Sequence, residues 1–143
     1  MTRLRLFHGG VPGLLPGDLI LPGHGRRHHD GCPWCEARAR GEAHLGIDPL
    51  AEGDRVYCTT NRLYAKHYAS LWGRGDLYGV EPVEWMVSSQ EDTIESFKTD
   101  SLRVTSVLER AVLLTFSERR RLLREWTAAD AAADARDRAA VNV

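Results

Sequence analysis

The chain has 143 residues, of which 43% are hydrophobic and 27% charged, and its formal net charge is −1. This length and composition predict one globular domain over residues 1–143 that can bury a core without disulfides. A nearly neutral charge argues against a general nucleic-acid coat, so nucleic acid is not the expected partner. No apolar run reaches the roughly 20 residues of a membrane span, and the N-terminus lacks a signal-peptide pattern. We therefore expect a cytoplasmic protein with no membrane partner.

The first third of the chain predicts two short strands followed by a long loop. Residues 3–7 alternate apolar and charged side chains, and the Gly9-Gly10 pair is expected to end that strand. Residues 15–18 read Leu-Pro-Gly-Asp, which favours a type II turn. Residues 19–21 form a brief extended piece, and residues 24–53 have no clear periodicity. A loop of that length is usually functional or mobile.

The middle of the chain predicts a strand, a helix and another strand. Residues 55–59 form the first strand, and either Thr59 or Thr60 is expected to cap a helix over residues 61–72. Residues 77–81 form the next strand, which Pro82 stops. The helix is expected to bury a face made of Leu63, Tyr64, His67, Tyr68, Leu71 and Trp72.

The last third predicts a strand and a C-terminal helix over residues 117–143. Residues 101–107 alternate as a strand does, whereas residues 109–116 fit either a strand or a helix. Ser117 is expected to cap the helix, with Glu118 favourable at its N-terminus. Its apolar face is expected to hold Leu122, Leu123 and Trp126, and the run Arg119–Arg121 with Arg124 to form a solvated face.

An ordered set of short segments resembles the rifamycin ADP-ribosyltransferases, small members of the ADP-ribosyltransferase superfamily. The resemblance covers residue 7 to about residue 108 and leaves out the long loop and the C-terminal helix. The segments are His8-Gly9-Gly10, Gly17-Asp18-Leu19 with Pro22-Gly23, Val56-Tyr57-Cys58-Thr59-Thr60, Gly73-Arg74-Gly75 leading into Tyr78-Gly79-Val80-Glu81-Pro82, and Leu102-Arg103-Val104.

The resemblance implies both a fold and an activity. The implied fold is α+β, with split, bent antiparallel β-sheets around an NAD cleft and few helices. The implied activity is NAD-dependent mono-ADP-ribosyl transfer, a glycosyltransferase reaction that moves ADP-ribose to an acceptor hydroxyl and releases nicotinamide. A rifamycin antibiotic is the implied acceptor, and its modification would inactivate it and give resistance.

The resemblance also implies roles for particular residues. His8 would hydrogen-bond ribose hydroxyls, because an imidazole offers one donor and one acceptor. Tyr57 would stack on the cationic nicotinamide ring. Asp92 best matches the family's acidic residue, which stabilises the oxocarbenium-like cation, with Glu91 and Glu84 as rivals. The remaining residues expected around NAD are Gly9, Gly10, Thr59, Thr60 and Tyr64.

Each of these residues also has an ordinary structural interpretation. His8 could be a turn residue, Tyr57 a core residue and Asp92 a solvated carboxylate. The segment between residues 82 and 101 is short, and the basic C-terminal helix is an addition to the family pattern. These departures leave open a toxin-like enzyme that modifies a protein or a nucleic acid.

The long loop carries the sharpest feature that the resemblance does not explain. Cys32 and Cys35 have a spacing that lets two thiolates share a metal, and His28 and His44, or His29, could complete a tetrahedral zinc site. The alternatives are two free thiols or a redox pair, although the preceding residues do not form the strand that a redox pair requires. A zinc-bearing binding module without catalytic activity is therefore a second functional class. Cys58, within a predicted strand, is expected to be a small buried residue.

Overall fold

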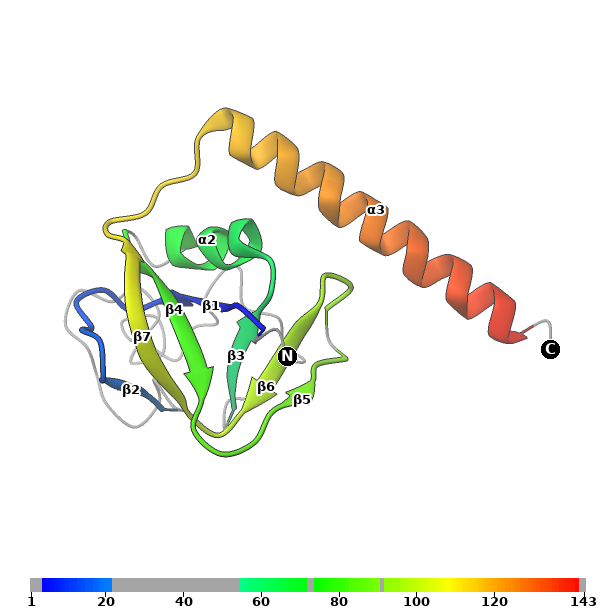
Figure 1. Cartoon of the computed structure of the whole chain (residues 1–143). Helices are drawn as coiled ribbons and strands as arrows, with labels where there is room; N and C mark the ends of the chain where they lie inside the picture. Colours follow the sequence, from blue (N-terminus) through cyan, green and yellow to red (C-terminus); the bar gives the residue numbers. More distant parts are fainter. Residues whose placement is uncertain (1–3, 22–54, 72–73, 91, 142–143) are drawn as a thin grey trace, which may run out of the picture.

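The computed structural model describes residues 4–21, 55–71, 74–90 and 92–141. Within these ranges the chain forms short strands, one helix in the middle and one helix at the C-terminal end (Figure 1). The elements are β1 (Leu6–Gly10), β2 (Leu19–Ile20), β3 (Val56–Thr59), α2 (Arg62–Leu71), β4 (Asp76–Pro82), β5 (Val87–Ser88), β6 (Ser96–Thr99), β7 (Leu102–Glu109) and α3 (Phe116–Val141).

The described strands form one antiparallel sheet with a narrow join in its middle. The strand order is β2-β7-β4-β1-β3-β6-β5. Strand β1 pairs with β4 along its whole length, from Leu6 opposite Val80 to Gly10 opposite Asp76, but it meets β3 only at Phe7 opposite Thr59. An α+β protein with an antiparallel sheet is therefore confirmed. The expected two sheets are instead one series of strands, and the ADP-ribosyltransferase fold stays a prediction.

The glycine pair lies inside strand β1 and does not end it. Gly9 pairs with Leu77 and Gly10 with Asp76. A Cβ atom on Gly9 would lie 1.9 Å from the carbonyl oxygen of Ala65 in α2. Only a residue without a side chain lets the helix pack this closely on the strand. The sequence pattern was misleading here because glycine marks a close approach of backbones as well as a turn.

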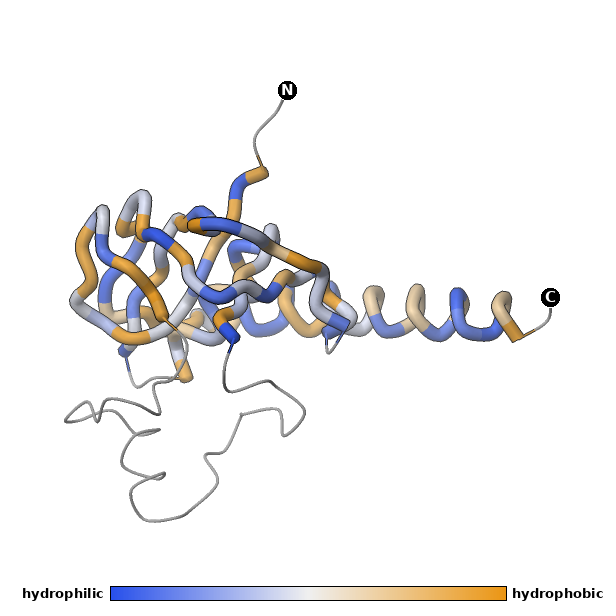
Figure 2. Tube along the Cα trace, turned by 90° about the horizontal axis from the view of Figure 1, so that it is seen from below, coloured by the Kyte–Doolittle hydropathy of each residue, from blue (hydrophilic) through white to orange (hydrophobic). Residues whose placement is uncertain are grey.

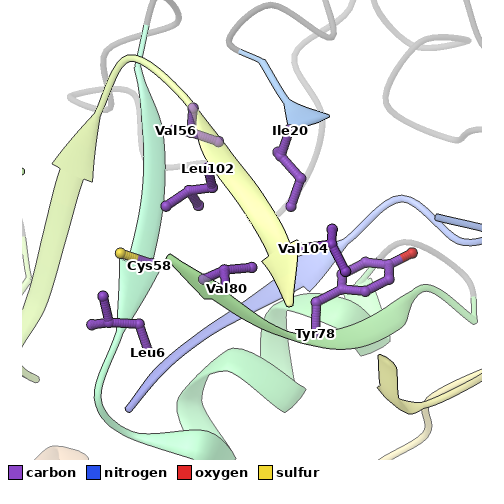
Figure 3. Packing of buried hydrophobic residues seen from close by; sticks show 8 residues of the cluster. All are labelled: Leu6, Ile20, Val56, Cys58, Tyr78, Val80, Leu102 and Val104. Carbon is purple, nitrogen blue, oxygen red and sulfur yellow. The ribbon is translucent and has the colours of Figure 1, made fainter. Parts of the chain in front are cut away.

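Apolar side chains fill both faces of the sheet. One face carries the largest cluster, which Figure 3 shows converging between the strands; its members are Leu6, Ile20, Val56, Cys58, Tyr78, Val80, Leu102 and Val104. The other face packs against α2 through Phe7 and Leu77, which contact the small residues Ala65 and Ala69. Neighbouring residues of β1 therefore belong to different faces: Leu6 to the first and Phe7 to the second.

Helix α2 begins at a different cap from the one expected. The Oδ1 atom of Asn61 accepts a hydrogen bond of 3.0 Å from the backbone N–H of Tyr64, which makes Asn61 the N-cap. Thr59, one of the two expected caps, instead accepts from the backbone N–H of Asn61 at 3.0 Å. Both arrangements satisfy N–H groups that the first turn leaves without a partner.

Helix α3 also begins before its expected cap. The backbone N–H of Glu118 donates to Thr115 Oγ1 at 3.1 Å, and the backbone N–H of Thr115 donates to Glu118 Oε1 at 3.0 Å. This reciprocal pair is a capping box, so Thr115 and not Ser117 is the N-cap. The ambiguous stretch before it is neither strand nor helix, because β7 ends at Glu109 and α3 begins at Phe116.

The part of α3 from Phe116 to Asp130 contacts the rest of the protein. At 26 residues, with a rise of about 1.5 Å per residue, the helix extends well beyond the sheet in both tube and ribbon views (Figures 1 and 2). Leu122 is buried in a cluster with Leu63 and Leu114. Leu123 was expected on the same face but is 66% exposed, because it lies about 100° further round the helix. Among the described residues, no helix has the length and apolar composition needed to cross a membrane.

Candidate active site

His8 and Tyr57 meet where β1 and β3 stop pairing. The Nδ1 atom of His8 lies 2.7 Å from the carbonyl oxygen of Tyr57. Since a carbonyl only accepts, Nδ1 must carry the proton in this contact. The imidazole therefore joins the two strands just beyond their one register pair, Phe7 with Thr59. A side chain holds the two halves of the sheet together at the point where backbone pairing ends.

The imidazole of His8 is held in its neutral form, in which it can accept a hydrogen bond. Burial lowers its pKa, because desolvation outweighs the opposing effect of the hydrogen bond to the Tyr57 carbonyl. A neutral ring that donates from Nδ1 has an unprotonated Nε2 atom. That nitrogen can accept a hydrogen bond from a hydroxyl group of a ligand.

Gly10 provides the space for this ring. A Cβ atom on Gly10 would lie 2.8 Å from Nε2 of His8, which is closer than real Cβ contacts. Gly10 and Gly9 were both expected near NAD, and they have different neighbours here. Gly9 lies against α2, whereas Gly10 lies against the ring of His8.

The phenol of Tyr57 leaves β3 on the other face from Cys58. Side chains alternate along a strand, and both Val56 and Cys58 belong to the cluster that contains Leu6. His8 shares the face of Leu6 by the same alternation. By this alternation the two rings leave the sheet on opposite faces, and the structure joins the ring of His8 to the backbone of Tyr57 only. That both rings hold one dinucleotide stays a prediction.

Thr59 and Thr60 bind the segment that leads into β6. Thr59 Oγ1 donates to the carbonyl oxygen of Glu95 at 2.6 Å, and Thr60 Oγ1 donates to the carboxylate of Glu95 at 2.8 Å. Thr59 also pairs with Ser96 across the two strands. These contacts fix the end of β3 to the turn before β6, which contains Asp92.

The carboxylate of Asp92 is held by one donor on each oxygen. The phenol of Tyr64 donates to Oδ1 at 2.6 Å, and the hydroxyl of Ser96 donates to Oδ2 at 3.1 Å. Of the rivals proposed from the sequence, Glu84 is exposed and Glu91 lies outside the described residues. Among these three, Asp92 is the carboxylate that the structure shows in a fixed orientation.

Tyr64 is the buried centre of this arrangement. Its side chain is 2% exposed, and burial, the neighbouring Tyr68 and the carboxylate of Asp92 all raise its pKa. A buried position and a place near NAD are both expected for Tyr64 from the sequence, whereas its hydrogen bond to Asp92 is not. The segment Ser96-Phe97, like Glu91-Asp92, resembles part of the family's acidic and aromatic segment, but no role was expected for Ser96, because a serine in an ambiguous segment gives no signal of its own.

A second buried carboxylate, Asp76, was also missed. It accepts hydrogen bonds from the backbone N–H groups of Gly13 and Ala111, both at 2.9 Å, and pairs with Arg110 at 2.5 Å. Although burial opposes it, this set of donors lowers the pKa of Asp76. Asp76, at the start of β4, thus ties the turn after β1 to the residues that follow β7, so we assign it a structural role.

The predicted zinc ligands Cys32, Cys35, His28 and His44 lie outside the described residues. Within the parts of the chain that the structure describes, no group of three or more His, Cys, Asp or Glu side chains is arranged to hold a metal ion. The zinc site therefore stays a prediction. Cys58 is buried at 3% exposure as expected, and burial raises the pKa of its thiol to about 12.

No protein-family model matches the chain, and no curated protein matches it significantly.

Proposed function

We propose that the protein is an NAD-dependent mono-ADP-ribosyltransferase. The observation that carries the proposal is the hydrogen bond from His8 Nδ1 to the Tyr57 carbonyl at the join between β1 and β3. It leaves Nε2 of His8 as an acceptor beside a position, Gly10, that has no side chain. The motif order that resembles the rifamycin ADP-ribosyltransferases supports the same assignment.

The proposed chemistry is displacement at the anomeric carbon of the nicotinamide ribose. The bond from that carbon to the nicotinamide nitrogen breaks, and nicotinamide leaves with the bonding electrons. The acceptor oxygen attacks the same carbon, and its proton passes to water. Because positive charge grows on the ribose in the transition state, a fixed carboxylate stabilises it more than it stabilises the substrate. In this proposal, Asp92 supplies that carboxylate.

His8 and Tyr57 have binding roles in the proposed reaction. The neutral imidazole accepts a hydrogen bond at Nε2 from a ribose hydroxyl, while its other nitrogen stays on the Tyr57 carbonyl. The phenol ring of Tyr57 is assigned the stacking on nicotinamide, whose cationic ring favours an aromatic face. Because the two rings leave the sheet on opposite faces, this role requires NAD to pass the point where β1 and β3 stop pairing. An antibiotic hydroxyl of the rifamycin type is the proposed acceptor, and a protein or nucleic acid acceptor is the alternative that the experiment below separates.

The test is incubation of the full chain with NAD, with and without a rifamycin. Free nicotinamide, the antibiotic and the protein are then measured by mass spectrometry. We expect nicotinamide release together with an antibiotic heavier by one ADP-ribosyl group. His8→Ala should abolish release, and Asp92→Asn should lower its rate strongly while leaving a measurable kcat. Release without modified antibiotic would retain the enzyme class and reject the acceptor, whereas no release and no NAD-induced rise in melting temperature would reject the function.

A further inference from the structure

The carboxylate of Asp92 is backed by a layer of aromatic side chains. We propose that Tyr64 is a positioning residue that fixes this carboxylate for ADP-ribosyl transfer, and that α3 supports Tyr64 from behind. This inference rests on the proposed function and extends it to a helix that the family resemblance does not cover. Four kinds of contact carry it: the hydrogen bond to Asp92, the hydrogen bond from Tyr68, the packing of Trp126, and the bonds that tie α3 to the segment around Asp92.

The direction of the hydrogen bonds follows from the chemistry of the groups. An ionised carboxylate only accepts, so the single hydroxyl proton of Tyr64 goes to Asp92 Oδ1 at 2.6 Å. The hydroxyl of Tyr68, 3.0 Å away, must then donate to the oxygen of Tyr64. The two phenols form a chain that ends on the carboxylate. Hydrogen bonds in such a chain polarise one another, which strengthens the last one.

Aromatic packing leaves the phenol of Tyr64 few alternative positions. Its ring meets the rings of Tyr68 and Trp126 edge to face, with centroids 5.1 Å and 5.2 Å away. Leu122 of α3 belongs to the same buried cluster. A buried ring held on two sides in this way has little rotamer freedom, so the donor stays aimed at Asp92.

Helix α3 also holds the chain on either side of this site. Thr93, next to Asp92, donates to Asp130 of α3 at 2.6 Å. Asn61, the cap of α2, donates to Glu125 of α3 at 3.1 Å. The helix therefore spans both the segment that carries Asp92 and the start of the helix that carries Tyr64. An added helix placed in this way adjusts the geometry of a carboxylate without touching a substrate.

The test compares Tyr64→Phe with a matched loss of a buried phenol elsewhere. Tyr78→Phe is the control, because Tyr78 is also fully buried and its hydroxyl bonds Val11 and Leu14, away from Asp92. For Tyr64→Phe we expect kcat for nicotinamide release to fall about tenfold or more, as loss of a hydrogen bond to a charged group implies, with KM for NAD within threefold. Tyr78→Phe should keep kcat within twofold of wild type.

A double variant separates positioning from loss of stability. If Tyr64 acts through Asp92, Tyr64→Phe added to Asp92→Asn should lower kcat no further than Asp92→Asn alone. Circular dichroism and melting temperature confirm that each variant is folded. An active wild type whose kcat is unchanged by Tyr64→Phe, or is lowered equally by Tyr78→Phe, would overturn this inference and leave the proposed function standing. A wild type that neither releases nicotinamide nor binds NAD would remove both.

Discussion

His8 holds Tyr57 by its backbone: the ring nitrogen Nδ1 lies 2.7 Å from the carbonyl oxygen, just past the one register pair of β1 and β3. A side chain thus replaces backbone pairing where the two halves of the sheet separate. Any change that moves the ring of His8 should alter both the contact between β1 and β3 and the proposed hydrogen bond to NAD. The neighbouring glycines give a direct way to test this relationship.

Gly9→Ala should mainly lower the stability of the protein, whereas Gly10→Ala should mainly lower its affinity for NAD. A methyl group on Gly9 meets the backbone of α2 at Ala65, which cannot yield, so we expect loss of several kcal/mol of stability, about the range of severe overpacking. A methyl group on Gly10 meets the ring of His8, which can turn away. That variant should fold with about 1 kcal/mol lost, as expected when His8 loses its hydrogen bond to Tyr57, but bind NAD at least tenfold more weakly. Urea unfolding and isothermal titration calorimetry measure the two effects, and equal loss of stability in both variants would contradict the assignment.

The pH dependence of NAD binding should follow the lowered pKa of His8. The neutral ring accepts from NAD, so affinity should stay constant from pH 8 down past about 6.5, the ordinary histidine value, and fall only below it. The unfolded chain takes up this proton first, so the contribution of His8 to stability is present above about pH 6.5 and decreases as the pH falls. His8→Gln keeps a donor but does not titrate. If its affinity falls with pH as steeply as that of wild type, another group is responsible.

Asp76→Asn should destabilise the protein most at neutral pH. The amide cannot accept all the hydrogen bonds of the carboxylate and leaves Arg110 without its charged partner, so we expect a loss of about 3 kcal/mol. Because the folded pKa of Asp76 is depressed, its contribution is present above the unfolded value of about 3.9 and is lost as the pH falls through the folded value. Urea unfolding between pH 7 and pH 2 should show the difference from wild type shrinking below about pH 4.

Arg110→Ala is the matched control for this ion pair. The guanidinium is 47% exposed, so water screens it, and we expect the loss to stay near 1 kcal/mol. A larger loss than for Asp76→Asn would mean that the arginine, and not the backbone donors, stabilises this corner of the fold.

Cys58 should not react with alkylating reagents in the folded protein. Its side chain is 3% exposed, lies 3.9 Å from the sulfur of Met86, and has a thiol pKa raised to about 12, so little thiolate forms at pH 8. Iodoacetamide followed by peptide mass spectrometry should find Cys58 modified only after denaturation. Modification at the rate of a free thiol in native buffer would show that this core opens readily.

Adjacent leucines of α3 should differ sharply in their effect on stability. Leu122→Ala removes a buried side chain and should cost about 2–4 kcal/mol, whereas Leu123→Ala, at a position 66% exposed, should stay within about 0.5 kcal/mol of wild type. Guanidinium unfolding monitored by tryptophan fluorescence measures both. Equal effects would mean that α3 packs on a different face from the one described here.

Local chemistry in the sequence determined a large part of this protein. The alternation in β7, the helical spacing of Leu63 and Tyr64, and the burial of Cys58 could all be predicted, because each depends on near neighbours and on the partition of apolar side chains away from water. The tertiary structure decided everything that depends on backbone approach and on contacts between distant segments. The sequence pattern predicts that Gly9 ends a strand, but Gly9 lies within β1 and allows α2 to pack closely on it. Hydrophobic periodicity likewise does not predict that Tyr64 donates a hydrogen bond to a carboxylate 28 residues away. Such contacts form only when the chain closes, and a linear pattern carries no record of which distant partner a buried polar group will find.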